Sequence, residues 1–500
     1  MAYLLGIDIG TSGTKTVLID EAGRMLASAY AEYPLAQPRP GWAEQDPDLW
    51  WQATLAGIAE VLKKTGLRGE EVAAVGLSGQ MHGAVLLDKD YQVLRPAILW
   101  CDQRTGAESE WIAETLGVEK LFAWSGNPAL PGFTAPKLLW MRRHEPALYA
   151  RIQHVLLPKD FIRWRLTAEL ATEVSDASGT LLLDVARRRW SPEMLAALAI
   201  PQSWLPPVYE SIEVSGRVSV SAAALTGLAA GTAVVGGGGD QAAGAVGAGI
   251  VQSGLLSVAL GTSGVVFAAT DEARILPGSG LHAFCHALPG KWHLMGVMLA
   301  AGASLQWLRN NMAPGDTYDN LTGRAARVQA GAEGLLFLPY LLGERTPYPD
   351  PAARGGFIGL SMRHELGHLV RAVLEGVAYG LRDSLELMKR LGVPGAEVRV
   401  SGGGARSALW RQIVADIFQA PVTVVNSSEG PAFGAALLAG TGVGVYASVE
   451  EACRKTIRVE SRQEPDPSAA EAYEKGYALY RSLYPLLRET MHGLTSGFGG

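Results

Sequence analysis

The chain has few cysteines, few charged residues and no basic character. Its 500 residues include three cysteines, Cys101, Cys285 and Cys453, far apart in the sequence. A small and odd number of widely spaced cysteines argues against a disulfide framework and a CxxC metal site, and it is typical of a protein in a reducing compartment. Charged residues make up 18% of the chain and the formal net charge is −6. The sequence therefore offers no basic face for nucleic acid.

No stretch of the sequence is apolar for long enough to cross a membrane. The least charged segment, residues 241–270, is interrupted throughout by Gly, Ser, Thr and Gln. No run reaches the ~18 apolar residues that a spanning helix needs. The first residues, MAYLLGIDIG, lack the basic region of a signal peptide and run into an acid at Asp8. These absences predict a cytoplasmic protein that binds neither membrane nor nucleic acid.

Glycine, by contrast, is in excess. The chain has 60 glycines, whereas an average composition of ~7% would give about 35. Apolar residues make up 48% of the chain, enough for a sizeable core, which excludes a disordered protein. The length exceeds that of one ordinary domain, and two large domains account for it.

The first 80 residues predict the start of an α/β domain. Residues 3–9 read as a buried strand, GTSGTK follows, and TVLID reads as a second strand. Residues 48–65 have helical spacing and residues 71–77 form another strand. Walker and dinucleotide-binding fingerprints need a helix directly after the glycine loop. Because a strand follows here, both motifs are disfavoured and a β-hairpin is expected.

The sequence GTSG occurs twice, at 10–13 and at 261–264, each time between two apolar segments. This repeat predicts two domains with related hairpin starts, residues 1–249 and residues 250–500, in close contact. The boundary falls after the glycine- and alanine-rich run AAGAVGAG. In the second domain we expect a helix at 365–392, a strand at 397–402, a helix at 407–419, a strand at 421–425 and a last helix from about 467.

The two hairpin tips are candidate phosphate sites. A tip of Gly, Thr, Ser and Gly can turn its backbone N–H groups to one side and bind an anion. Asp8, at the end of the preceding strand, is a candidate ligand of Mg²⁺ through water. An ordinary tight hairpin with a solvated Lys15 is the alternative for one tip alone, but two tips across a cleft would clamp a polyphosphate. The candidates are Gly10, Thr11, Ser12, Lys15, Gly261, Thr262 and Ser263.

Four consecutive glycines deliver one carboxylate, Asp240. They follow TAVVG, a buried strand, so the acid lies at a strand's carboxyl end, where ligands bind in open α/β sheets. Glycines there allow a ligand or another backbone to approach closely. Phosphoryl transfer to an alcohol requires an aspartate that accepts the hydroxyl proton. A simple Gly-Asp turn needs only one or two glycines, so the pattern favours a catalytic Asp240.

Three further motifs follow predicted strands. In SGQMHG, Gln80 and His82 can hydrogen-bond a sugar and Met81 can cover its apolar face, although a lone histidine is more often structural. In ILWCDQR, Trp100 suits a polyol pocket, whereas for Arg104 a buried ion pair beside a packed tryptophan is favoured. GGGARS, at 402–407, lets a base or ribose approach the backbone, although such turns are common. GPAFGAA, at 430–436, is expected against the same region, and GERTP, at 343–347, has no assignment.

These motifs, with LPKDFIR, LGTSG and RAVLEGVAYGLRD, resemble in their order the FGGY family of carbohydrate kinases, and most closely its bacterial xylulokinase branch. The resemblance runs from Leu4 to about Leu487. It implies two actin-like (ribonuclease H-like) ATPase domains flanking a deep cleft. It also implies the phosphorylation of D-xylulose by ATP with Mg²⁺. A homodimer is common among relatives and is expected here, with the tyrosines of the last helix packed on the body or on another subunit.

The resemblance also assigns roles to residues. Asp240 matches the catalytic base and Asp8 the acid that places metal and phosphate. Met81 and His82 match sugar contacts, with Gln80, Trp100 and Gln241 expected beside them. The second GTSG matches a phosphate loop, and Gly403, Gly404 and Ala405 match the adenosine loop. Gln241 stands where some relatives have asparagine, and Cys101 replaces an expected asparagine.

Other functions stay open at this point. A kinase for another ketose or polyol, such as ribulose or fuculose, is the nearest alternative. An actin-like or chaperone-like nucleotide-switched binding protein would need neither GQMHG nor an aspartate behind four glycines. A sugar-responsive repressor would need a DNA-binding domain, which these motifs do not include. Since many motif glycines lie at strand ends, we expect much of the glycine excess to face one cleft.

Overall fold

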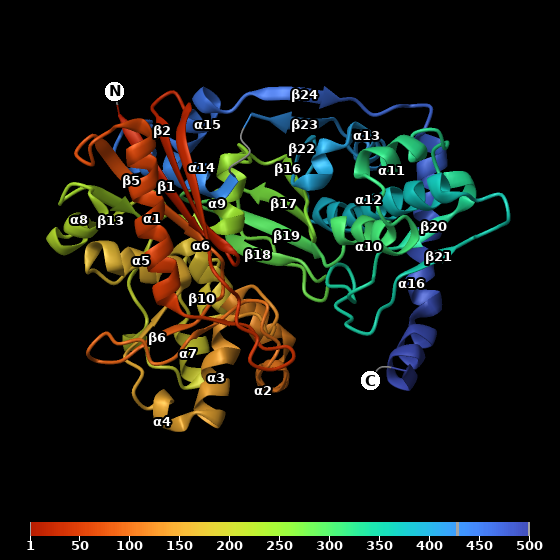
Figure 1. The fold of residues 1–500 in the computed structure, drawn as a ribbon. Coiled ribbons are helices and arrows are strands. Elements are labelled where there is room, and N and C mark those ends of the chain that lie inside the picture. Colours follow the sequence, from red (N-terminus) through yellow and green to blue (C-terminus); the bar gives the residue numbers. More distant parts are fainter. Residues whose placement is uncertain (1, 427–429, 499–500) are drawn as a thin grey trace.

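The computed structural model describes residues 2–426 and 430–498, and it is built around two seven-stranded sheets (Figure 1). The first sheet has the order β13-β14-β5-β1-β2-β3, with β15 also paired to β5. Its strands are β1 (Tyr3–Ile9), β2 (Gly13–Asp20), β3 (Met25–Glu32), β5 (Val72–Gly79), β13 (Val214–Arg217), β14 (Ala233–Val235) and β15 (Gly238–Gly239).

The second sheet repeats the pattern of the first in the order β18-β19-β17-β16-β22-β23-β24. In both sheets the opening hairpin is antiparallel, the third strand joins antiparallel, and two later strands add in parallel on the other side. The predicted repeat and the two-domain α/β class are thereby confirmed. The strands are β16 (Leu255–Leu260), β17 (Gly264–Thr270), β18 (His282–Cys285), β19 (Trp292–Met298), β22 (Glu397–Ser401), β23 (Val422–Val425) and β24 (Val459–Gln463).

Three long helices begin at capping residues that the sequence shows. Helix α1 (Pro47–Thr65) starts after Asp46, whose side chain accepts the Asp48 N–H, and ends at Gly66 with a φ of 70°. Helix α12 (Leu366–Arg390) begins with a capping box and is buried along most of its length, and α13 (Ala408–Phe418) follows a serine N-cap. All three match the segments expected from helical spacing.

Helix α14 (Gly430–Gly442) comes from the second half of the sequence but packs on the first sheet, beside α9 (Asp240–Gly247), and Figure 1 shows both helices between the sheets. A Cβ on Gly6 would lie 1.9 Å from the Ala432 carbonyl oxygen. One on Gly434 would lie equally close to the Ala243 oxygen. These glycines therefore let a helix approach a strand or another helix, whereas we expected them to face ligands.

The chain thus returns to its first sheet after the expected boundary at residue 249. Helix α15 (Val449–Thr456) follows α14 and shares a core with strands of that sheet. The domain limits 1–249 and 250–500 stay a prediction.

The last helix, α16 (Ala470–Phe498), packs on the second half of the molecule. Tyr473, Tyr477, Tyr480 and Tyr484 are buried, and the Tyr484 hydroxyl donates to Asp350 at 2.6 Å. These tyrosines therefore pack on the body of the same chain, which is one of the two placements expected from the sequence. The homodimer stays a prediction. Among the described residues no helix is long and apolar enough to cross a bilayer.

Candidate active site

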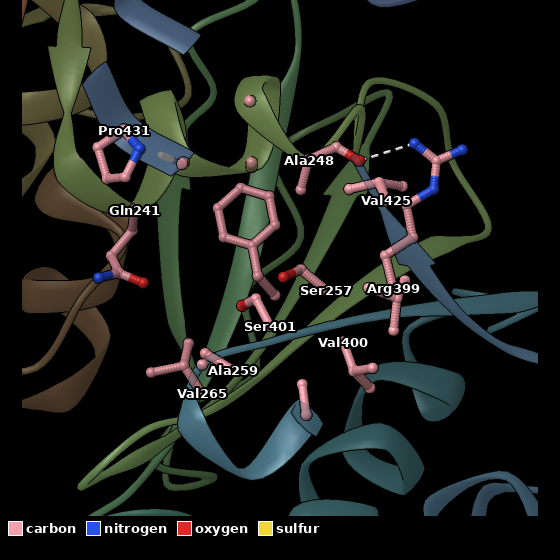
Figure 2. A pocket seen from close by; sticks show the side chains of 18 of the residues that line it. Gln241, Ala248, Ser257, Ala259, Val265, Arg399, Val400, Ser401, Val425 and Pro431 are labelled. Carbon is pink, nitrogen blue, oxygen red and sulfur yellow. Dashed lines mark hydrogen bonds between the residues drawn. The ribbon is translucent and has the colours of Figure 1, made fainter. Parts of the chain in front are cut away.

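A cavity of about 950 Å³ lies between the two halves of the molecule. Figure 2 shows Gln241 on one side of it and Arg399 with Val425 on the other. The first half contributes Asp8, Lys15, Asp240, Gln241 and small residues of α9. From the second half come, among others, Ser257, Ser401, Gly402, Gly403, Ala405, Arg406, Arg411 and Asn426.

Asp8 lies at the end of β1, opposite Lys15 of β2 in the strand register. One carboxylate oxygen, Oδ1, is buried and has no hydrogen-bond partner in the described part of the chain. Burial raises the pKa of Asp8 to about 6. An orphaned carboxylate oxygen at this cavity fits a divalent cation that keeps several waters. Residues 2–426 and 430–498 hold no cluster of three or more His, Cys, Asp or Glu side chains that could bind a metal ion.

Asp240 is the first residue of α9 and lies directly after residues 236–239, which are called the base loop after the role predicted for Asp240. A Cβ on Gly237, whose φ is +76°, would lie 2.0 Å from the Leu77 oxygen, and one on Gly239 would lie 3.0 Å from Met81 Cγ. These glycines therefore make room for strand β5 and for Met81. Burial, and then the charge of Asp8, raise the pKa of Asp240 to about 7. A carboxyl with this pKa is suited to accept a proton near neutral pH.

Met81 and His82 follow β5, and Met81 lies next to the base loop. Met81 is buried and packs against Gly239, since a Cβ on that glycine would lie 3.0 Å from Met81 Cγ. His82 Nδ1 lies 2.6 Å from the Gly179 carbonyl oxygen, so this nitrogen carries the hydrogen and donates it. Burial lowers the pKa of His82 to about 3. The ring is therefore neutral, and its Nε2 can accept a hydrogen bond.

Gln80 and Trp100 are hydrogen-bonded to the first hairpin tip. Trp100 Nε1 donates to Thr11 Oγ1 at 2.9 Å, and that hydroxyl donates to Gln80 Oε1 at 3.2 Å. Gln80 Nε2 donates to Gln45 Oε1 at 3.2 Å. Both ends of the Gln80 amide are thus hydrogen-bonded to other side chains of the protein. The side chain connects the segment of Met81 and His82 to the first hairpin tip.

The two hairpin tips lie outside the lining of the 950 Å³ cavity. Ser12 is exposed at the first tip, and Thr262 and Ser263 are exposed at the second. The second tip is held by α10 (Gly302–Met312), whose first backbone N–H donates to the Gly261 oxygen at 2.8 Å. Of the residues expected at the nucleotide, Lys15, Gly403 and Ala405 line the cavity, whereas Gly10, Thr11, Ser12, Gly261, Thr262, Ser263 and Gly404 do not.

Comparisons with known proteins decide the family. Residues 3–247 match the N-terminal domain of the FGGY family of carbohydrate kinases, and residues 256–443 match its C-terminal domain. The chain belongs to this family. Enzymes of the FGGY family use ATP and a divalent metal.

Individual FGGY relatives are similar over nearly the whole chain. The chain is 42% identical to the xylulose kinase of Escherichia coli, covering 97% of this chain and 99% of that protein. It is 39% identical to the xylulose kinase of Bacillus subtilis over 99% of both. A solved kinase from Brucella ovis, titled a xyloylose kinase, superposes with a TM-score of 0.92 at 40% identity, covering 98% of this chain and all of that one. The expected actin-like architecture of this family is thereby confirmed.

Several polar residues of the cavity were not expected from the sequence. Arg399, Arg406, Arg411, Asn426 and Glu460 line the cavity from the second half. Arg399 donates to the Ala248 oxygen at 2.7 Å, drawn in Figure 2, and Arg411 donates to the Ala405 oxygen at 2.6 Å. Arg406 lies inside GGGARS and could have been included with that motif. Arg399 and Arg411 sit within ordinary strand and helix patterns, which carry no signal for a site.

The buried ion pair favoured for Arg104 is confirmed. Arg104 donates to both oxygens of Asp102, at 2.9 and 2.7 Å, and also contacts Glu44. The tryptophan packed on its guanidinium is Trp42, at 3.6 Å, while Trp100 is 43% exposed. This cluster therefore stabilises the fold beside the site.

The unassigned loop at 343–347 extends toward His82. Thr346 Oγ1 donates to the Gly280 oxygen at 2.9 Å and accepts the Val297 N–H at 3.1 Å, which anchors the loop on β19. Arg345 lies close enough to His82 for its charge to contribute to the low pKa of that ring. The second half thus brings a cation toward a residue of the first half.

Proposed function

We propose that this FGGY kinase transfers the γ-phosphoryl group of ATP to D-xylulose, giving D-xylulose 5-phosphate and ADP. The observation that carries the proposal is the position of Asp240. Its carboxyl lines the same cavity as Asp8, Lys15 and the turn at 402–405, and Met81 packs directly against its loop. The similarity to xylulose kinases of 39% and 42% identity over nearly full length supports D-xylulose as the acceptor.

In the proposed reaction the sugar binds beside Met81 and His82 with its terminal hydroxyl at Asp240. Neutral His82 accepts a hydrogen bond from another sugar hydroxyl, because its Nδ1 hydrogen is already donated to Gly179. The hydroxyl oxygen forms a bond to the γ-phosphorus while the bond to the ADP oxygen breaks. Asp240 takes the hydroxyl proton and later releases it to water. The nucleotide lies against Gly403 and Ala405, and the exposed hydroxyls of both hairpin tips complete the phosphate site when the halves close.

The expected metal is Mg²⁺, and Asp8 would hold it through water. When bound, Mg²⁺ neutralises charge on the phosphate oxygens. Lys15, across the hairpin from Asp8, adds positive charge on the same side of the cleft. The protein thus places one acid for the metal and another for the proton.

A panel of sugars assayed by ADP release tests the proposal. We expect stoichiometric ADP release with D-xylulose at a kcat/KM at least about tenfold above that for ribulose, fuculose and glycerol, since a mismatched hydroxyl leaves buried polar groups unpaired. Preference for another ketose or polyol would assign that acceptor and keep the chemistry. ATP binding with no sugar-dependent ADP release would favour a nucleotide-switched binding protein. The cytoplasmic location and the homodimer stay predictions.

A further inference from the structure

The base loop carries the reacting carboxylate, yet it consists of four glycines. Glycine has the largest backbone freedom of any residue, so such a loop does not hold its own conformation. A displacement of ~1 Å at a reacting group can cost ~100-fold in rate. The loop must therefore be held by other parts of the chain, and the structure contains a buried set of side chains that does so.

Both ends of the base loop are hydrogen-bonded to buried side chains. At its start, Arg163 of α5 (Pro158–Thr167) donates to the Gly236 oxygen at 2.8 Å. At its end, the Gly239 N–H donates to Ser175 Oγ at 3.0 Å. Arg163 and Ser175 are both 0% exposed. The Gly239 N–H belongs to the peptide bond that directly precedes the one joining Gly239 to Asp240, so Ser175 holds the backbone one step before the proposed base.

The Ser175 hydroxyl is itself oriented by Glu173. Ser175 Oγ donates to Glu173 Oε1 at 2.9 Å, which leaves its lone pairs for the Gly239 N–H. The other Glu173 oxygen accepts the Ser175 N–H at 2.7 Å and the Ser211 hydroxyl at 2.9 Å. The Ser211 carbonyl in turn accepts the Gly237 N–H at 2.8 Å. Hydrogen bonds to a buried carboxylate are strong and polarise one another, so the serine has one orientation.

The same short segment also touches the sugar site and the second half. Helix α6 (Val174–Ala177) and the turn after it carry Ser175, Ser178 and Gly179. The Gly179 oxygen accepts the His82 Nδ1–H at 2.6 Å, and Ser178 Oγ accepts the Cys285 N–H of β18 at 3.0 Å. Lys159 balances the acids beside the segment, with its Nζ 2.7 Å from Asp160 and 3.4 Å from Glu173.

We infer that Ser175, oriented by Glu173, is a positioning residue for phosphoryl transfer that holds Asp240 in place through the Gly239 N–H, and that Arg163 holds the other end of the same loop. This inference rests on the proposed function, because it assumes that Asp240 is the base. It adds residues outside the lining of the cavity and outside the sugar and nucleotide contacts proposed above.

The test is the variant Ser175→Ala, compared with Ser109→Ala. Ser109 is also buried, and its hydroxyl donates only within its own helix, to the Thr105 oxygen at 3.0 Å. We expect Ser175→Ala to lower kcat by ~10- to 100-fold with the sugar KM changed by less than ~3-fold. Ser109→Ala should change neither value. If Ser175→Ala does not fold, Arg163→Lys is the second variant. It keeps the buried charge and should likewise lower kcat while leaving the sugar KM nearly unchanged.

A double-mutant cycle with Asp240→Asn tests whether Ser175 acts through the base. In the Asp240→Asn background, followed by transfer of labelled phosphate, Ser175→Ala should cost less than ~3-fold, because the group that it positions is gone. Equal costs in both backgrounds, or a normal kcat for folded Ser175→Ala and Arg163→Lys, would overturn the inference. Failure of the proposed function is seen separately, as a wild-type enzyme that does not phosphorylate D-xylulose or an Asp240→Asn variant that keeps its turnover.

Discussion

Replacing Asp240 by asparagine should abolish most activity and at the same time stabilise the protein. Asparagine has nearly the shape of the protonated aspartate but cannot accept the hydroxyl proton. General-base catalysis contributes ~10²- to 10⁴-fold, so kcat should fall by that factor while sugar binding persists. For the wild type, kcat should decline about tenfold per pH unit below pH ~7, because the pKa of Asp240 is raised to about 7.

The stability gain follows from the same pKa. Asp240 titrates at about 7 in the folded protein and at 3.8 as a model group. The protonated form is therefore favoured by folding, and its contribution is fully present below pH 3.8 and is lost as pH rises through about 7. The difference of about three pKa units corresponds to about 4 kcal/mol. Asparagine retains the neutral form, so the variant should match the wild type near pH 4 and exceed it above pH 7.

Thermal unfolding without nucleotide or Mg²⁺, measured at several pH values between 4 and 8, gives the comparison. Asp90→Asn is the matched control, since Asp90 is exposed on a turn outside the site. The control should shift melting equally at all pH values and leave kcat unchanged. An Asp240→Asn protein that turns over normally, or that is less stable than the wild type at pH 8, would refute the argument.

Four further outcomes are expected. Gly6→Ala should lower the free energy of unfolding by about 1–3 kcal/mol or more, because its Cβ would lie 1.9 Å from the Ala432 oxygen. No atom lies within 4 Å of the position that a Cβ on Gly403 would take, so Gly403→Ala should leave stability unchanged and raise the KM for ATP. Equal melting shifts for the two glycine variants would contradict the packing argument. The sugar KM should be constant from about pH 5 to 8 because burial keeps His82 neutral, and a KM that rises below pH 6.5 would show a protonated ring. Asp8→Asn should raise the Mg²⁺ concentration needed for half-maximal activity on the order of tenfold. It should also move the acid limb of the kcat profile to lower pH, because the charge of Asp8 contributes to the raised pKa of Asp240. An unchanged Mg²⁺ dependence would exclude Asp8 from the metal site.

Local patterns were sufficient to predict the elements that begin each half. The alternation of apolar residues around GTSG predicted the hairpins of β1 with β2 and of β16 with β17. Capping residues and helical spacing predicted α1 and α12. Four glycines before Asp240 made this residue the candidate base, because the pattern exceeds what a simple turn needs, and that role stays a prediction. All of these signals lie within a few residues of the feature that they predict.

The contacts of the site depend on residues far apart in the sequence. A side chain at Gly6 would clash with Ala432, and one at Gly237 would clash with Leu77. The base loop is hydrogen-bonded to Ser175 and Arg163. The motif glycines at these positions read as ligand contacts in the sequence, whereas the structure shows close backbone packing. Arg399 and Arg411 reach the cavity only because their strand and helix face it.

The sequence by itself thus determined the two-domain α/β class and the repeated hairpins, and it predicted Asp8 and Asp240 as the principal acids, because strand alternation, capping and glycine runs are local in their physics. Only the tertiary structure decided that α14 returns to the first sheet and that a buried serine and arginine hold the base loop. Such contacts depend on which backbones meet after folding, and no pattern along one segment records the residue that will lie against it.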